Sequence, residues 1–153
     1  MRAIEPWVEQ PLATFLGESA ARIALLMTSS GQVIAQHGFT RSFDVMSAAA
    51  LGAGIIASTR ELALELGAAG FGSVVHQGPD LGVYLAPFEV PRGRWIGLVV
   101  FGSDTSLGLV QLFFERMVQE LARTAPAAPA PRKVLAETFE DELNASLRAL
   151  FGR

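Results

Sequence analysis

The sequence contains no cysteine and only two histidines among its 153 residues. Without cysteine, disulfide bonds, thiolate zinc sites and cysteine nucleophiles are excluded. His37 and His76 are far apart in the sequence, and neither occurs in a metal-ligand spacing. Paired carboxylates, or a base close to a nucleophile, are not apparent either. We therefore expect no catalytic residue, no metal and no cofactor, and an enzyme in its own right is the least favoured class.

Other absences narrow the choice of partners and location. The net charge is −3, so a basic surface for nucleic acid is not expected. No GxxxxGK[ST] motif occurs, and the GxG of Gly52 and Gly54 lies inside a helical pattern, so a nucleotide-binding loop is not indicated. The longest uncharged apolar run, 45–56, is well short of the ~20 residues of a membrane span. The amino terminus carries prolines and acids instead of an apolar signal core, which predicts a cytoplasmic protein.

Half of the residues are hydrophobic, enough for the core of one domain, which we place at 8–124. Periodicity and turn residues predict the order α-β-β-α-β-β-β-α, an α+β domain with one mostly antiparallel sheet. Strands that are apolar on both faces should be central, and strands of mixed polarity should be edges. The central strands are then 22–28 and 94–102, and the edges are 32–38 and 71–78. The remaining elements are helices 10–21, 42–67 and 105–124 and strand 82–88.

An Ala/Pro-rich linker at 125–132 follows the domain and favours an extended conformation. The tail, 133–153, is predicted to form an amphipathic helix. Such a helix on a stiff tether can dock in a groove on a partner, or it can fold back on its own domain. Its apolar face comprises Phe139, Leu143, Leu147, Leu150 and Phe151.

The predicted helix 42–67 has no charged side chain between Asp44 and Arg60, and it is apolar or small on nearly every side. One side can pack on the sheet, but the other would face water at a cost of about 25 cal/mol per Å² of apolar surface. This predicts a second partner surface, although the rest of the chain could also wrap the helix. Strand 71–78 has no Lys or Pro to block pairing with another chain, unless the monomer covers that edge itself.

Three stretches resemble the roadblock/dynein light chain family, and most of all its bacterial MglB-like branch. They are "ALLMTSSGQVIA", "FGSVVHQGPDLGVYLAPF" and "LVVFGSDTSLGLVQLFFERMVQEL". The resemblance spans about 22–123, and TSLG (105–108) together with HQG (76–78) is its most specific part. The tail ending "LRALFGR" is also similar to the carboxyl-terminal helix of that branch.

The resemblance implies a five-stranded antiparallel sheet with the long helix on one face and the other two helices on the opposite face. It also implies a homodimer joined through the third strand and the long helix. The partner implied is a small Ras-like, MglA-like GTPase, with this protein as its activator, acting on the GTPase's own switch residues without inserting an arginine. The expected dimer-interface residues are Ala49, Ala50, Phe71, Ser73, Val75 and Gln77.

By position, Ala53 and Ala57 match family positions that face the GTPase. Arg60 lies on the next turn of the same helix and departs from the small residues expected there. The tail helix is implied to make a second contact with the GTPase and to promote nucleotide exchange. Bacterial cell polarity or gliding motility, with recruitment to a cell pole, is implied by the resemblance alone. The alternatives are a roadblock dimer that binds a GTPase or signalling protein without altering turnover, and a sensory module with an enclosed ligand pocket.

Overall fold

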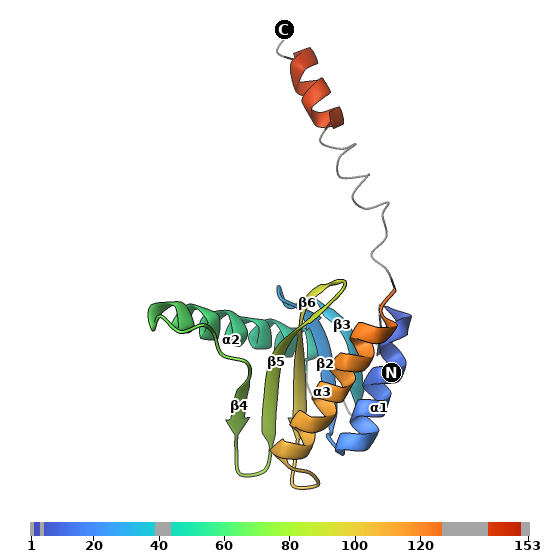
Figure 1. Ribbon diagram of the computed structural model, residues 1–153, viewed down its shortest axis with the longest axis vertical. Helices are drawn as coiled ribbons and strands as arrows, with labels where there is room; N and C mark the ends of the chain where they lie inside the picture. Colours follow the sequence, from blue (N-terminus) through green and yellow to red (C-terminus); the bar gives the residue numbers. More distant parts are fainter. Residues whose placement is uncertain (1, 4, 39–43, 127–140, 151–153) are drawn as a thin grey trace.

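The computed structural model describes residues 2–3, 5–38, 44–126 and 141–150, and one antiparallel sheet lies between its helices (Figure 1). A further helix covers 141–150. The other elements are β1 (Arg2–Ala3), η1 (Pro6–Val8), α1 (Glu9–Ser19), β2 (Ile23–Thr28), β3 (Val33–Gly38), α2 (Val45–Glu65), β4 (Val74–Gln77), β5 (Gly82–Val90), β6 (Gly93–Phe101) and α3 (Leu107–Thr124).

The sheet has the strand order β1-β3-β2-β6-β5-β4. All five predicted strands are present, β2 and β6 are central, and β4 is an edge, so these predictions are confirmed. The prediction that β3 is an edge is wrong, because the two-residue strand β1 pairs outside it through Arg2 with Gln36 and Ala3 with Ala35. The sheet therefore has six strands.

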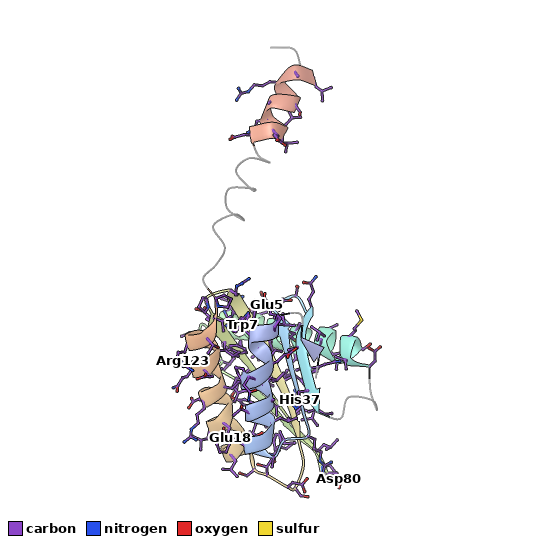
Figure 2. All side chains as sticks on the ribbon, turned by 90° about the vertical axis from the view of Figure 1, so that its right-hand side faces the viewer. Glu5, Trp7, Glu18, His37, Asp80 and Arg123 are labelled. Atoms are coloured by element: carbon purple, nitrogen blue, oxygen red, sulfur yellow. The ribbon has the colours of Figure 1, made fainter. Side chains whose placement is uncertain are left out.

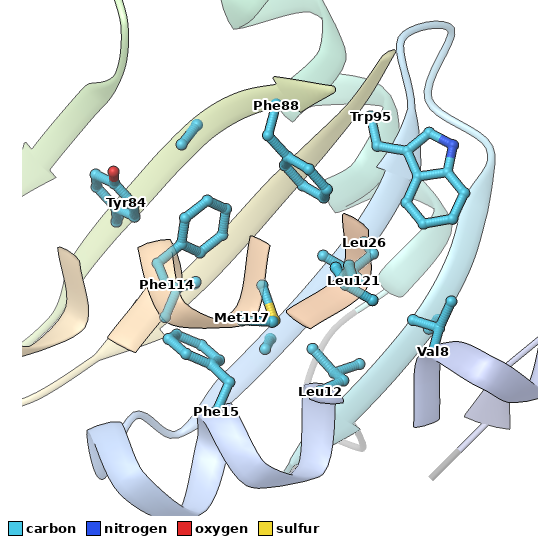
Figure 3. Packing of buried hydrophobic residues seen from close by; sticks show 14 of the residues in the cluster. Val8, Leu12, Phe15, Leu26, Tyr84, Phe88, Trp95, Phe114, Met117 and Leu121 are labelled. Carbon is cyan, nitrogen blue, oxygen red and sulfur yellow. The ribbon is translucent and has the colours of Figure 1, made fainter. Parts of the chain in front are cut away.

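Helices cover both faces of the sheet, as expected for the α+β class. Helix α2 packs on one face, where Ala49 and Ala53 meet apolar side chains of β2, β5 and β6. Helices α1 and α3 pack on the opposite face and share a larger core (Figure 3). In that core the ring of Phe114 meets Phe15, Tyr84 and Phe88 edge to face at centroid distances of 5.9, 5.3 and 5.7 Å. Aromatic rings fill this layer, which argues against a sensory module with a ligand held there.

The ends of α2 follow from two residues. The Asp44 carboxylate accepts a hydrogen bond from the Ser47 hydroxyl at 2.8 Å. It also accepts hydrogen bonds from the backbone N–H groups of Ser47 and Met46 at 3.2 and 3.1 Å. These hydrogen bonds lower the pKa of Asp44 and fix the first turn. At the other end, Gly67 has a φ of 66°, and Ala68 donates to the Ala63 carbonyl at 2.9 Å. Helix α2 therefore lies within the predicted range 42–67.

Helix α2 approaches the sheet most closely at Gly52. A Cβ atom there would lie 3.2 Å from side-chain methyls of Leu85 and Leu98, whereas a Cβ at Gly54 would meet nothing within 4 Å. We expect Gly52→Val to lower the free energy of unfolding by about 1–3 kcal/mol, because overpacking shifts α2. Gly54→Ala is the matched control and should raise it by up to about 1 kcal/mol. Denaturant titrations at one protein concentration measure both, and an unchanged midpoint for Gly52→Val would contradict the packing described.

Candidate functional site

Helix α2 is the element that its own chain covers least. It crosses the sheet, and its carboxyl-terminal half projects beyond β4 (Figure 1). After Ala53, the next buried residue of α2 is Ala63. Large apolar side chains of the helix face solvent instead, namely Met46, Leu51, Leu62 and Leu64. Leu66, which immediately follows the helix, is exposed as well.

One side of α2 carries Leu51, Leu62 and Leu66, with exposed fractions of 70, 54 and 66%. Spacings of 11 and 4 residues place these side chains on one stripe of the helix. Next to the amino-terminal part of this stripe is an open apolar depression of the sheet, which we call the sheet groove. Its lining includes Leu51, Ile55, Leu81, Val83 and Val100.

The other side of α2 carries Ala50, Ala57 and Leu64, which are spaced by seven residues and therefore lie in line along the helix. All three are exposed. Beside them lies a second depression, which we call the overhang groove, bounded by the projecting half of α2, the loop that follows it and the adjacent sheet. Its lining includes Ala57, Arg60, Leu64, Phe71 and Arg94.

The structure divides the predicted α2 residues into two groups. Ala49 and Ala53 are 0 and 6% exposed and pack on the chain's own sheet, so their side chains are not offered to a partner. This corrects their use as contact residues. Ala50, Ala57 and Arg60 are exposed. The sequence misled here because small residues occur all round the helix, so the pattern does not show which of them face the sheet.

Strand β4 is the other predicted interface element. It covers only Val74–Gln77, so Phe71 and Ser73 lie in the preceding loop, where both are exposed. Val75 is half-buried and Gln77 is exposed within the strand. Among the described residues, β4 pairs with β5 and with no other strand. Its outer edge is therefore open to a second strand.

The tail contributes a helix at 141–150 in which every residue is exposed. Leu143, Leu147 and Leu150 are 48, 43 and 78% exposed and lie on one stripe. The other two predicted tail contacts, Phe139 and Phe151, lie outside the described residues. Most of the predicted linker also lies outside them, because the description stops at residue 126 and resumes at 141.

The described residues hold no group of three or more side chains that could bind a metal ion. His37 on β3 and His76 on β4 belong to strands that lie four positions apart in the sheet order. Burial lowers the pKa of His37, which favours its neutral form. Within the part of the chain that the structure describes, no helix is both long enough and apolar enough to cross a membrane.

Sequence reasoning missed the stripe of Leu51, Leu62 and Leu66. The signal was present as three leucines on one side of a helical wheel. It was obscured because Arg60, Glu61 and Glu65 make the second half of the helix read as an ordinary solvated segment. Only the position of α2 on the sheet shows that this stripe remains uncovered.

Solved structures of known proteins share this fold. MglB of Myxococcus xanthus superposes with a TM-score of 0.70 at 28% identity, covering 78% of this chain and 95% of that one. The gliding protein MglB of Thermus thermophilus superposes with a TM-score of 0.66 at 33% identity, covering 78% and 88%. A roadblock/LC7 domain of Streptomyces avermitilis shares the fold at 16% identity, with a TM-score of 0.61 over 70% of this chain and 88% of that one. Neither a scan against protein-family models nor a search of curated proteins gives a match.

The fold is thus a roadblock/LC7 fold, in which one long helix covers one face of the sheet and two helices cover the other. Within that class, the 33% identity over most of the Thermus protein decides the branch. The chain belongs to the MglB branch, and its fold is that of roadblock/LC7 domains.

Proposed function

We propose that this protein works as a homodimer that regulates a small Ras-like GTPase of the MglA type. The observation that carries the proposal is the uncovered apolar surface of α2 in a chain of the MglB branch. Each exposed leucine of α2 leaves apolar area in water that a partner could cover. Both the second copy and the GTPase are assigned to this helix.

The open edge of β4 supports pairing with β4 of a second copy. Antiparallel pairing of two identical strands is a two-fold arrangement, in which the same surface serves on both sides. It would carry the projecting half of each α2 over the sheet of the other copy. The stripe with Leu62 and Leu66 would then cover the partner's sheet groove, where Leu81 is exposed and Val83 is half-buried. One of the similar structures, an MglB, is described as having a tetrameric arrangement, so association of copies occurs within the branch.

The GTPase is assigned to the other side of α2. Ala57 leaves room for a partner backbone to come close, and Arg60 stands beside it at the overhang groove. Ala50, which the sequence assigns to the dimer interface, lies in line with Ala57, so we assign it to this side instead. In the dimer, two such sides form a shallow platform. A GTPase on this platform is activated only if the platform binds the hydrolysis-competent arrangement of its switch loops more tightly than the other arrangements. The chemistry then belongs to the GTPase, and this chain supplies no catalytic group.

Single-turnover GTP hydrolysis tests the activating role. The partner is the small GTPase that co-purifies with this protein, and its hydrolysis rate is measured with and without the dimer. We expect acceleration that saturates with dimer concentration. Binding with an unchanged rate would leave the scaffold role instead, in which the dimer positions the GTPase, for example at a cell pole, without altering turnover.

The tail is proposed to act on the same GTPase by promoting nucleotide exchange, through Leu143, Leu147 and Leu150 together with Phe139 and Phe151. Deleting residues 133–153 should therefore slow nucleotide release more than it slows hydrolysis. Release of a fluorescent GDP analogue and single-turnover hydrolysis, measured on the same preparations, provide the comparison. Equal losses in the two assays would contradict a separate role for the tail.

A further inference from the structure

Helices α1 and α3 run side by side on the face of the sheet opposite to α2, and a groove follows the line between them (Figure 2). We call it the α1–α3 groove. Pro11, Phe15 and Met117 are buried along it, and Trp7 and Phe113 are half-buried beside them. The volume of the groove is about 360 Å³. This surface has no part in the pairing of β4 or in the platform on α2.

Among the described residues, no element packs on the helix at 141–150, and every side chain of it is exposed. Most of the stability of a helix in a protein comes from packing of its apolar face, because nucleating an isolated helix is costly. The stripe of Leu143, Leu147 and Leu150 is the surface from which that packing energy can come. The helix therefore needs an apolar groove to cover this stripe.

We propose that helix 141–150 docks in the α1–α3 groove of its own chain and exchanges with the detached position. The ten described residues of the tail helix span about 15 Å, and the 11 residues of α1, which lines the groove, span about 16 Å, so this part of the helix fits along the groove. Thr124, the last residue of α3, lines the groove, so the tether starts at the groove itself. The segment 125–140 spans at most about 55 Å, which is ample for the tail helix to return to the groove.

Charge selects the direction in which the tail helix lies. Arg123 stands at the upper end of the α1–α3 pair and Glu18 at the lower end (Figure 2). A tail helix antiparallel to α3 brings its acidic first turn, with Asp141 and Glu142, towards Arg123, which is already paired with Glu120. It also brings Arg148 towards Glu18, whose ion pair with Arg116 is stretched to 4.0 Å.

Docking has a consequence for the tail's other assigned role. The leucines that would fill the α1–α3 groove are the same ones that would contact the GTPase. The two contacts are mutually exclusive, so a tail helix bound in the groove cannot contact the GTPase until it leaves the groove. The docking itself does not depend on the proposed function, and its test needs no GTPase.

The absence of cysteine makes the test direct, because one introduced cysteine is the only attachment point for a nitroxide spin label. Gln10, an exposed residue that lines the groove, is replaced by Cys and labelled in the full chain. Paramagnetic broadening should then cause loss of the amide NMR signals of 143–150. The same label on Glu61→Cys, an exposed position of α2 outside the stripe of Leu51, Leu62 and Leu66, should leave those signals intact. Intact signals with the label at position 10 would overturn the proposal.

Two variants and one mixture decide what causes the broadening. Leu147→Asp should restore the signals, whereas Ala145→Asp, with the same added charge on the opposite side of the tail helix, should not. Broadening that survives Leu147→Asp would mean chance encounters of the tether and would overturn docking. Isotope-labelled chains without nitroxide, mixed with unlabelled spin-labelled chains, should keep their signals. Loss in this mixture would assign the groove to the tail of another copy and would also overturn the proposal.

Discussion

Leu62→Asp is expected to convert the protein from a dimer to a monomer without unfolding it. The side chain is 54% exposed in the single chain, so the change creates no cavity in the core. At the proposed interface it replaces a buried leucine with a carboxylate, at a cost of about 2 kcal/mol or more. Because the dimer is two-fold symmetric, the substitution occurs once in each copy and its energetic cost is incurred twice. The dimer dissociation constant should therefore rise by about 10³-fold or more.

Sedimentation equilibrium measures this change, and circular dichroism checks that the fold is retained. Met46→Asp is the matched control, because Met46 is 77% exposed but lies four residues before Ala50, on the side of α2 that carries Ala50 and Ala57 and not on the stripe with Leu62. It should leave the dimer intact. If the Leu62→Asp variant is as dimeric as the Met46→Asp control, the stripe is not part of the dimer interface.

Ala57→Arg is expected to abolish GTPase binding while leaving both the fold and the dimer in place. Ala57 is exposed on the side of α2 that the platform uses, and a guanidinium there would hold a docking backbone several ångströms away. The loss should exceed about 100-fold in affinity, equivalent to about 3 kcal/mol. Titration calorimetry with the GTP-loaded GTPase measures it, with Ala57→Ser as the control that keeps a small side chain.

The neighbouring substitution Ala53→Arg, which the sequence alone makes an equally good test, would instead unfold the site. Ala53 is 6% exposed and packs on the sheet, so an arginine there overfills the core beneath α2. Unimpaired binding by Ala57→Arg would mean that the GTPase docks elsewhere. Lost binding by Ala53→Arg would show only that α2 had been displaced.

The elements of the fold were predictable because local chemistry fixes them. Asp44 has the side chain that caps α2, Gly67 can adopt the left-handed conformation that ends it, and the apolar runs of β2 and β6 require burial on both faces. Strand β1 was not predictable, because two residues carry no periodicity and pair only where β3 happens to offer its edge.

The candidate site was predictable only in outline. An uncharged helix with more apolar surface than one sheet can cover indicated an interface on α2, and the open edge of β4 was readable from its composition. The sequence could not predict which side of α2 faces the sheet, because Ala49, Ala50 and Ala53 are chemically alike. Only the packing at Gly52 decides which of them face the sheet. The α1–α3 groove depends on contacts between segments about a hundred residues apart, which no local pattern encodes.

Helix α2 has more apolar surface than its own chain covers, and in our proposal a second copy covers the remainder. Sedimentation equilibrium of the unmodified chain at about 10 µM, a concentration at which a specific dimer of micromolar or better affinity is populated, tests this pairing. We expect a mass of twice the 16.3 kDa chain. A single species at the mass of one chain would contradict it.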